Sequence, residues 1–216
     1  MRYEIKIPIL FLDMNNIKNK FLRIKNLNRH YQDRFISSIY FDTNDLQFAN
    51  YNIEGISNRY KFRVRWYNDN KNFNYEIKRK FNKLSEKSVY PSDLKISDNF
   101  KDLFSKKNSD LNKKINNDEK FIINNFRLSP KLKVEYLREY YIYKKSVRLT
   151  LDHTPIYKNL FNTIKKIKDT FSILEIKFEE KDYDIASNLI KLFKINPKRY
   201  SKYVKGLSMT DRLNYF

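Results

Sequence analysis

The stretch from Arg59 to Tyr67 alternates basic and apolar residues with the two-residue period of a β-strand. One face of this predicted strand carries cations and a tyrosine, and the other carries apolar side chains: Arg59, Lys61, Arg63, Arg65 and Tyr67 against Tyr60, Phe62, Val64 and Trp66. Four cations in one row repel one another, whereas a surface strand more often mixes charges of both signs. This basic row therefore favours a densely anionic partner. For the strand taken alone, a solvated outer face is the alternative.

The composition points the same way. The 216 residues include 45 Lys and Arg against 25 Asp and Glu, a formal net charge of +20. Such an excess favours nucleic acid, an anionic membrane or phosphate-rich small molecules as partners. The absence of Cys excludes a disulfide scaffold, a thiolate metal site and a Cys nucleophile. With His30 and His153 as the only histidines, a His-rich metal site or a Ser-His-Asp triad is poorly supported.

The sequence shows no targeting segment. It opens at MRYEIK with strand-like alternation rather than an apolar signal region. No apolar run approaches the roughly 20 residues that a spanning helix needs. We expect a cytoplasmic protein, with any attachment to a membrane made through a partner protein.

The rest of the chain reads as strands separated by helices. Alternation predicts further strands at Arg2–Ile9, Arg34–Asp42, Phe73–Lys80, Ser85–Tyr90, Lys131–Tyr143, Ser146–Asp152 and Phe171–Phe178, with a hairpin connection at Asn68–Asn72. Helical spacing predicts helices at Asp13–Asn28, Asp98–Lys106, Asp118–Phe126 and Asp182–Ile195, and a short helix or turn at Thr43–Tyr51 before a turn at Gly55. We expect a single domain over residues 1–216. Residues 91–130 would form a helical insertion too short to own a core.

The tripeptide Glu-Ile-Lys occurs in three predicted strands, at Glu4–Lys6, Glu76–Lys78 and Glu175–Lys177. A spacing of two residues places both charges of each copy on one face of its strand. A solvent-facing ion pair is the simpler explanation of a single copy. Three copies, together with the basic row and Arg148 on a further strand, favour charged faces that are enclosed.

Enclosure of these faces predicts the fold class. The apolar faces can be covered by the amphipathic helices, which leaves the charged faces to point inward. The predicted architecture is therefore α+β: an antiparallel closed β-barrel, or tunnel, with a charged interior and helices flanking it.

A tunnel of this kind suits a phosphate chain. Crowded cations raise each other's energy, and burial adds a desolvation cost. Phosphoryl groups relieve both, because Arg and Lys can hydrogen-bond to them. The carboxylates of Glu175, and after it Glu4 and Glu76, could hold Mn²⁺ or Mg²⁺, which take one or two carboxylates alongside phosphate oxygens. A metal and a cationic clamp are what phosphoryl transfer requires.

Eight segments occur in the order found in a known family: RYEIK, ISSIYFDT, RYKFRVRWY, YEIKRK with SEKS, YLREYY, SVRLTLD, ILEIKF and RYSKYVKG. In these segments the chain resembles the VTC domain, the catalytic domain of vacuolar transporter chaperone polyphosphate polymerases in the CYTH, or triphosphate-tunnel, superfamily. The resemblance covers nearly the whole chain and is weakest from Pro91 to Pro130. It implies a tunnel enzyme that transfers the γ-phosphate of ATP onto a growing polyphosphate chain with Mn²⁺ or Mg²⁺.

The resemblance also implies roles for individual residues. The cations expected to contact the reacting phosphates are Lys6, Arg63, Arg65, Lys78, Arg138 and Arg148. Further phosphate contacts are expected from Lys87, Lys177, Ser201 and Lys202. Glu175 matches the metal ligand, with Glu4 and Glu76 as additional candidates.

Two other functions remain open from the sequence. A tripolyphosphatase or nucleoside triphosphatase would use the same tunnel, with water in place of the phosphate nucleophile. Hydrolases of the superfamily often begin Glu-x-Glu-x-Lys, and Arg2 stands at the first of these positions, which favours the polymerase. A polyanion-binding module without catalytic activity is the third hypothesis. Nucleic acid is disfavoured as its ligand, because carboxylates on the basic faces would repel the backbone. A membrane-protein partner is expected only if the product is exported.

Overall fold

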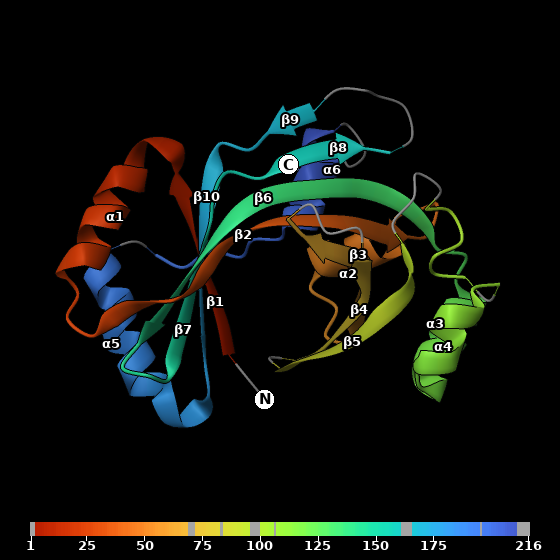
Figure 1. Ribbon diagram of the computed structural model, residues 1–216, viewed down its shortest axis with the longest axis horizontal. Helices are drawn as coiled ribbons and strands as arrows, with labels where there is room; N and C mark the ends of the chain where they lie inside the picture. The colour runs from red at the N-terminus through yellow and green to blue at the C-terminus, as the bar shows by residue number, and fades with distance from the viewer. Residues whose placement is uncertain are drawn as a thin grey trace. The chain divides into compact units, whose positions relative to one another are not determined.

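The computed structural model describes residues 3–68, 72–82, 84–95, 100–105, 107–160, 166–194 and 196–210 (Figure 1). The described strands are β1 (Tyr3–Leu10), β2 (Leu27–Asp42), β3 (Arg59–Tyr67), β4 (Asn72–Phe81), β5 (Leu84–Lys95), β6 (Ser129–Tyr143), β7 (Val147–Asp152), β8 (Ile156–Asn159), β9 (Lys166–Lys168) and β10 (Phe171–Phe178). The described α-helices are α1 (Met14–Arg23), α2 (Gln47–Glu54), α3 (Ser109–Lys114), α4 (Asn117–Asn125), α5 (Tyr183–Phe193) and α6 (Lys202–Met209). The strands form one antiparallel sheet in the order β1-β10-β7-β6-β2-β3-β4-β5, with β8 paired to β6 and β9. The α+β class with flanking helices is confirmed.

Contacts within the chain gather into two compact units. Unit 1 consists of Met1–Phe35, Tyr136–Ile156 and Lys168–Lys202, and unit 2 of Ile36–Glu135, Tyr157–Ile167 and Tyr203–Phe216. Each unit has a hydrophobic core of its own. The single domain over residues 1–216 stays a prediction.

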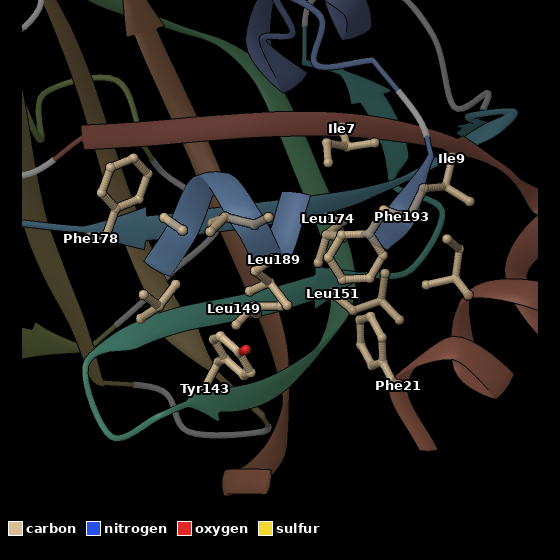
Figure 2. Close-up of a cluster of buried hydrophobic side chains, with 14 of the residues drawn as sticks. Ile7, Ile9, Phe21, Tyr143, Leu149, Leu151, Leu174, Phe178, Leu189 and Phe193 are labelled. Carbon is tan, nitrogen blue, oxygen red and sulfur yellow. The ribbon is translucent and has the colours of Figure 1, made fainter. Parts of the chain in front are cut away.

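The core of unit 1 lies between the strands β1, β7 and β10 and the helices α1 and α5 (Figure 2). In the antiparallel register, Leu174 of β10 lies beside Ile7 of β1 and Leu151 of β7. Phe21 of α1 and Phe193 of α5 meet over this face, with ring centroids 5.7 Å apart in an edge-to-face arrangement. Because side chains alternate along a strand, the opposite face of the same strands receives the charged residues.

The core of unit 2 is built mainly from aromatic rings on β2, β3 and β4. Phe62 of β3 lies beside Phe41 of β2 and Ile77 of β4 in the register. The rings of Phe48, from α2, and Phe104 pack against Phe62 at centroid distances of 5.3 and 5.7 Å. Helices α3 and α4 add buried side chains to this core. The basic row of β3 therefore occupies the face that these groups leave uncovered.

A buried carboxylate fixes the start of α2. Asp42 accepts hydrogen bonds from the backbone N–H groups of Phe48 and Ala49 at 3.0 and 2.9 Å, where a helix has donors without intrahelical partners. It also accepts from the hydroxyl of Tyr203 at 2.8 Å. Burial raises the pKa of Asp42 above its usual value, although these donors oppose the shift. The predicted turn after α2 is confirmed at Gly55, whose φ of 84° favours glycine.

Several boundaries differ from the sequence predictions. The helix predicted at Asp98–Lys106 is wrong, because the described residues 100–105 form turns that bury Phe104. The first helix ends at Arg23 rather than Asn28, and β2 begins at Leu27, since Asn26 turns the chain with a φ of 68°. β5 continues beyond Tyr90 to Lys95, and Pro91 is tolerated there because the described ladder pairs β5 with β4 alone. The hairpin connection at 69–71 lies outside the described residues.

The sequence also failed to predict β8, β9 and α6. α6 occupies a stretch that showed only a basic tail, and it packs closely on unit 2 through Gly206. A Cβ at Gly206 would lie 2.5 Å from Leu132 and 2.6 Å from Tyr157, so only glycine fits without displacing them. Among the helices that the structure describes, none has the length and apolar character to cross a bilayer.

The core of unit 1 provides a direct test of the packing. Leu149, which is labelled in Figure 2, is fully buried, whereas Leu22 on α1 is 85% exposed. We expect Leu149→Ala to lower the free energy of unfolding by about 2–5 kcal/mol, because it removes buried methyl groups and leaves a cavity. Leu22→Ala, the same change at the surface, should stay within about 0.5 kcal/mol of wild type. Urea unfolding followed by circular dichroism measures both, and equal effects would contradict the assigned core.

Candidate functional site

The charged face of unit 2 surrounds one carboxylate with three cations. Glu76 of β4 lies opposite Arg63 of β3 in the register and is 2% exposed. Its Oε2 accepts from Nε of Arg63 at 2.6 Å and lies 3.8 Å from NH1 of Arg65. Its Oε1 accepts from Nζ of Lys87, on β5, at 3.2 Å. The predicted proximity of Arg63, Arg65 and Lys87 is therefore present, with Glu76 at the centre.

The electrostatics keep Glu76 ionised. Burial alone would raise the pKa of this carboxyl group, but the charges of Arg63, Arg65 and Lys87 outweigh burial and hold the pKa well below its usual value. Both carboxylate oxygens are occupied by cations. These contacts give Glu76 the role of a counter-ion that orients the three cations, and its role as a metal ligand stays a prediction.

Hydroxyl groups of β2 complete the arrangement in unit 2. Arg65 donates from Nε to the Ser38 hydroxyl at 3.0 Å, and Arg63 donates from NH1 to the Tyr40 hydroxyl at 3.1 Å. The ring of Tyr40 stacks on that of Tyr203 in α6, with centroids 4.9 Å apart. The sequence pattern did not identify these three partners, although Ser38 and Tyr40 share a face in its predicted strand.

In unit 1 a second buried carboxylate has cationic neighbours. Glu175 of β10 is 6% exposed and lies beside Lys6 of β1 in the register. Its Oε1 lies 2.6 Å from Nζ of Lys177, and its Oε2 lies 3.9 Å from NH2 of Arg138. Lys6 pairs with Glu4 at 3.1 Å. The structure therefore brings together Lys6, Arg138, Glu175 and Lys177, as the sequence predicts.

Asp152, a further buried carboxylate in unit 1, is not among the site residues predicted from the sequence. Asp152 of β7 is fully buried and forms a two-point ion pair with the guanidinium of Arg138, including NH2 to Oδ2 at 2.7 Å. Lys202, at the first position of α6, pairs with the same carboxylate and lies over the ring of Tyr136, 4.8 Å from its centroid. The alternation in SVRLTLD already placed Asp152 on the face of Arg148, which is the signal that could have found it.

The cations of unit 1 hold its buried carboxylates in the ionised state. Burial alone would raise the pKa of Glu175, but Lys177, followed by Lys6, Arg138 and Lys202, lowers it well below the usual value. Burial would likewise raise the pKa of Asp152, and Arg138 with Lys202 lowers it. Burial would lower the pKa of Arg138, but the neighbouring carboxylates, Asp152 foremost, raise it well above the usual value.

The remaining predicted residues occupy less central positions. Arg148 lies opposite Lys177 in the register, but its side chain is exposed, and no ion pair to it is found among the described residues. Lys78 lies between Lys61 and Lys87 in the register of unit 2. Ser201 directly precedes α6 and is half-buried. Arg2, which bears on the hydrolase alternative, lies outside the described residues.

The donor set of unit 1 fits a divalent cation with few protein ligands. In the backbone register, Glu4 lies opposite Lys177 and Glu175 lies opposite Lys6, so the two carboxylates are diagonal neighbours on the same face of β1 and β10. Mg²⁺ and Mn²⁺ suit carboxylate oxygens, and Mg²⁺ typically takes one or two of them with water and phosphate oxygens completing the shell. Within the described residues, no group of three or more His, Cys, Asp or Glu gathers as a metal site. A metal held by protein ligands alone is therefore not indicated.

One family model matches nearly the whole chain. The VTC domain matches residues 2–210, and no curated protein matches the sequence. Among solved structures, HpAC1 of Hippeastrum, described as an adenylyl cyclase candidate with dominant triphosphatase activity, aligns with a TM-score of 0.57 at 13% identity, covering 99% of this chain and 97% of that one. PH1819 of Pyrococcus horikoshii aligns with a TM-score of 0.52 at 16% identity, and the alignment covers 98% of this chain and 99% of that one. At these identities the structural likeness shows a shared fold.

Acid titration tests the counter-ion role of Glu76. Its pKa is lower in the folded than in the unfolded protein, so its contribution to stability is present above the unfolded value of about 4.3 and is lost as the pH falls toward the folded value. We expect Glu76→Gln to lower the free energy of unfolding by about 3 kcal/mol at pH 7. The difference from wild type should shrink as the pH falls below about 4. Urea unfolding at several pH values measures this, with exposed Glu54→Gln as the control. A pH-independent difference would contradict the role.

Proposed function

The chain belongs to the VTC domain family, and from this premise we propose that it is a polyphosphate polymerase. It transfers the γ-phosphate of ATP onto a growing inorganic polyphosphate chain, and it depends on Mn²⁺ or Mg²⁺. The observation that carries the proposal is the family match over residues 2–210, nearly the full chain. The likeness of the fold to a protein described as a triphosphatase supports a phosphate-handling reaction.

The charged faces supply what such a reaction needs from a protein. Phosphoryl transfer requires positioning and charge neutralisation rather than covalent bonding to the enzyme. In unit 2 the guanidinium groups of Arg63 and Arg65 are pre-oriented by Glu76, Ser38 and Tyr40. Pre-oriented donors stabilise developing charge without reorganising during the reaction. Lys78 and Lys87 extend the same face along β4 and β5 and would bind further phosphoryl oxygens.

Unit 1 supplies a second set of cations, which are held by two buried carboxylates rather than one. Arg138 and Lys202 are held by Asp152, and Lys177 is held by Glu175. An arriving phosphoryl group offers oxygen acceptors that these cations can bind bidentately or as point charges. Lys6, Arg138, Lys177 and Lys202, with Ser201, would therefore bind phosphate in this unit, and exposed Arg148 would contact it at the edge of the face.

The proposed reaction is an in-line displacement. An oxygen of the terminal phosphate of the polymer attacks the γ-phosphorus of ATP, a new P–O–P bond forms, and the bond to the β-phosphate oxygen breaks to release ADP. The cations offset charge on the transferring group and the leaving group. Glu175 and Glu4 would hold the divalent cation, which when bound neutralises phosphate charge as a Lewis acid.

A triphosphatase is the second candidate. The same phosphate ligands serve both reactions, because water can replace the terminal phosphate of the polymer as nucleophile. The triphosphatase activity described for HpAC1, whose fold this chain shares, favours keeping this candidate. The two functions differ in product, which is free phosphate for the hydrolase and polymer with ADP for the polymerase.

Product analysis decides between them. Pure protein incubated with ATP and Mn²⁺ should form polyphosphate visible on a gel, with ADP as co-product, and EDTA should abolish both. Release of free phosphate without polymer would establish the hydrolase instead. Formation of neither product would overturn the proposed enzyme and leave a polyanion-binding module.

A matched pair of arginine variants tests the charged face of unit 2. Arg65 points to Glu76 and Ser38, whereas Arg79 of β4 belongs to the opposite face, over the ring of Tyr60. We expect Arg65→Ala to lower kcat/KM for ATP about a hundredfold or more, because it removes a donor to the phosphoryl group. Arg79→Ala should stay within about twofold of wild type. Equal losses in both variants would contradict the assignment of the face.

A further inference from the structure

One hydroxyl on the charged face of unit 1 lacks a partner. Thr150 of β7 is 8% exposed, and its Oγ1 is buried without a hydrogen bond to any described residue. The register places Thr150 between Glu175 of β10 and Tyr140 of β6. Cross-strand partners of this kind share a face of the sheet. The orphan hydroxyl therefore belongs to the same face as Glu175 and Asp152.

The neighbouring acceptors are already committed to cations. Glu175 directs its Oε1 to Lys177 at 2.6 Å, and its Oε2 lies near the guanidinium of Arg138 at 3.9 Å. Asp152 is saturated by Arg138 and Lys202. A buried hydroxyl without a partner costs folding free energy, and an isosteric valine at this strand position would avoid that cost. The threonine is thus better explained by an acceptor that arrives with a ligand.

The surroundings define which acceptor that is. Glu175, the register partner of Thr150, has four cations acting on it, on Lys6, Arg138, Lys177 and Lys202, and such a group of cations attracts an anion. A phosphoryl oxygen is a strong acceptor, and a hydroxyl that donates to it gains the strength of a charge-assisted hydrogen bond. The cations that pair with carboxylates in the free protein can turn toward an arriving phosphate, which leaves a phosphoryl oxygen available to the hydroxyl on the same face.

We propose that the Thr150 hydroxyl is a phosphate-binding group, which donates a hydrogen bond to a phosphoryl oxygen of the substrate. The inference rests on the proposed function, because it assumes a phosphate chain on this face. It adds an uncharged donor on the charged face to the cations that would bind the chain. Thr150 contributes to binding and positioning of phosphate, and proton transfer is not part of its role.

Isosteric replacement separates this role from a structural one. Thr150→Val removes the hydroxyl and keeps the shape, while Thr150→Ser keeps the hydroxyl. Ser172 of β10 is the matched control, since its hydroxyl is also buried with no hydrogen-bond partner in the part of the chain that the structure describes. Ser172 is two residues from Leu174 on the same strand, so it shares the apolar face with Leu174 and lies on the face opposite Glu175. Inorganic tripolyphosphate, titrated calorimetrically with and without Mg²⁺, is the probe.

We expect the loss of the hydroxyl to weaken phosphate binding without lowering the stability of the free protein. Thr150→Val should leave Tm unchanged or higher, because no hydrogen bond is lost in the free protein, and should weaken tripolyphosphate binding about tenfold. Thr150→Ser and Ser172→Ala should bind within about twofold of wild type. Wild-type affinity in Thr150→Val would overturn the proposal, and so would a lowered Tm or failure to fold. Absence of tripolyphosphate binding by wild type would instead overturn the proposed function, on which this inference depends.

Discussion

Burial of carboxylates among cations is the constraint on which the charged faces depend. Taking a carboxylate out of water costs several kcal/mol unless partners compensate. Glu76 in unit 2 and Glu175 and Asp152 in unit 1 meet that requirement, each with at least two cationic neighbours. In return, each carboxylate fixes cations that would otherwise repel one another. A face that is rich in Arg and Lys can therefore be held in order before any anionic ligand arrives.

The helices make these faces available by covering the other side of the strands. α1 and α5 bury the apolar residues of β1, β7 and β10, and α2, α3 and α4 do the same for the strands of unit 2. The period of two then places the residues that alternate with these apolar side chains, including Arg63, Glu76 and Glu175, on the side that the helices do not cover. Loss of a helix from either unit would expose the apolar face of the strands. The packing that fixes which face carries the charged residues would then be lost. Packing on one side and phosphate binding on the other are thus coupled through the strands.

A different ionic cluster in unit 1 shows that buried charge is not confined to the proposed site. Glu139 of β6 contacts Lys18, Arg29 and His153 at 3.1, 3.0 and 2.6 Å. Burial would raise the pKa of Glu139, but His153, Tyr141 and Lys18 lower it well below the usual value. Glu139 lies opposite Leu151 in the register, and it therefore belongs to the face of the sheet that α1 covers. These contacts connect α1 and β2 to β6, which is a structural role.

The alternation of residues along single strands was enough to determine which side chains share a face, and this held for Arg63 with Arg65, Glu76 with Lys78 and Glu175 with Lys177. Such local patterns, with the order of the eight family segments, gave the α+β class and the family. These patterns could not predict the ion-pair partners, because pairs such as Lys202 with Asp152 depend on how segments far apart in the chain align and pack. The tertiary structure alone decided that Asp152 is a buried counter-ion, that Arg148 is exposed and that the Thr150 hydroxyl has no hydrogen-bond partner among the described residues. Alternation fixes the direction of a side chain, whereas its partner and its burial are set by the neighbouring strands and helices.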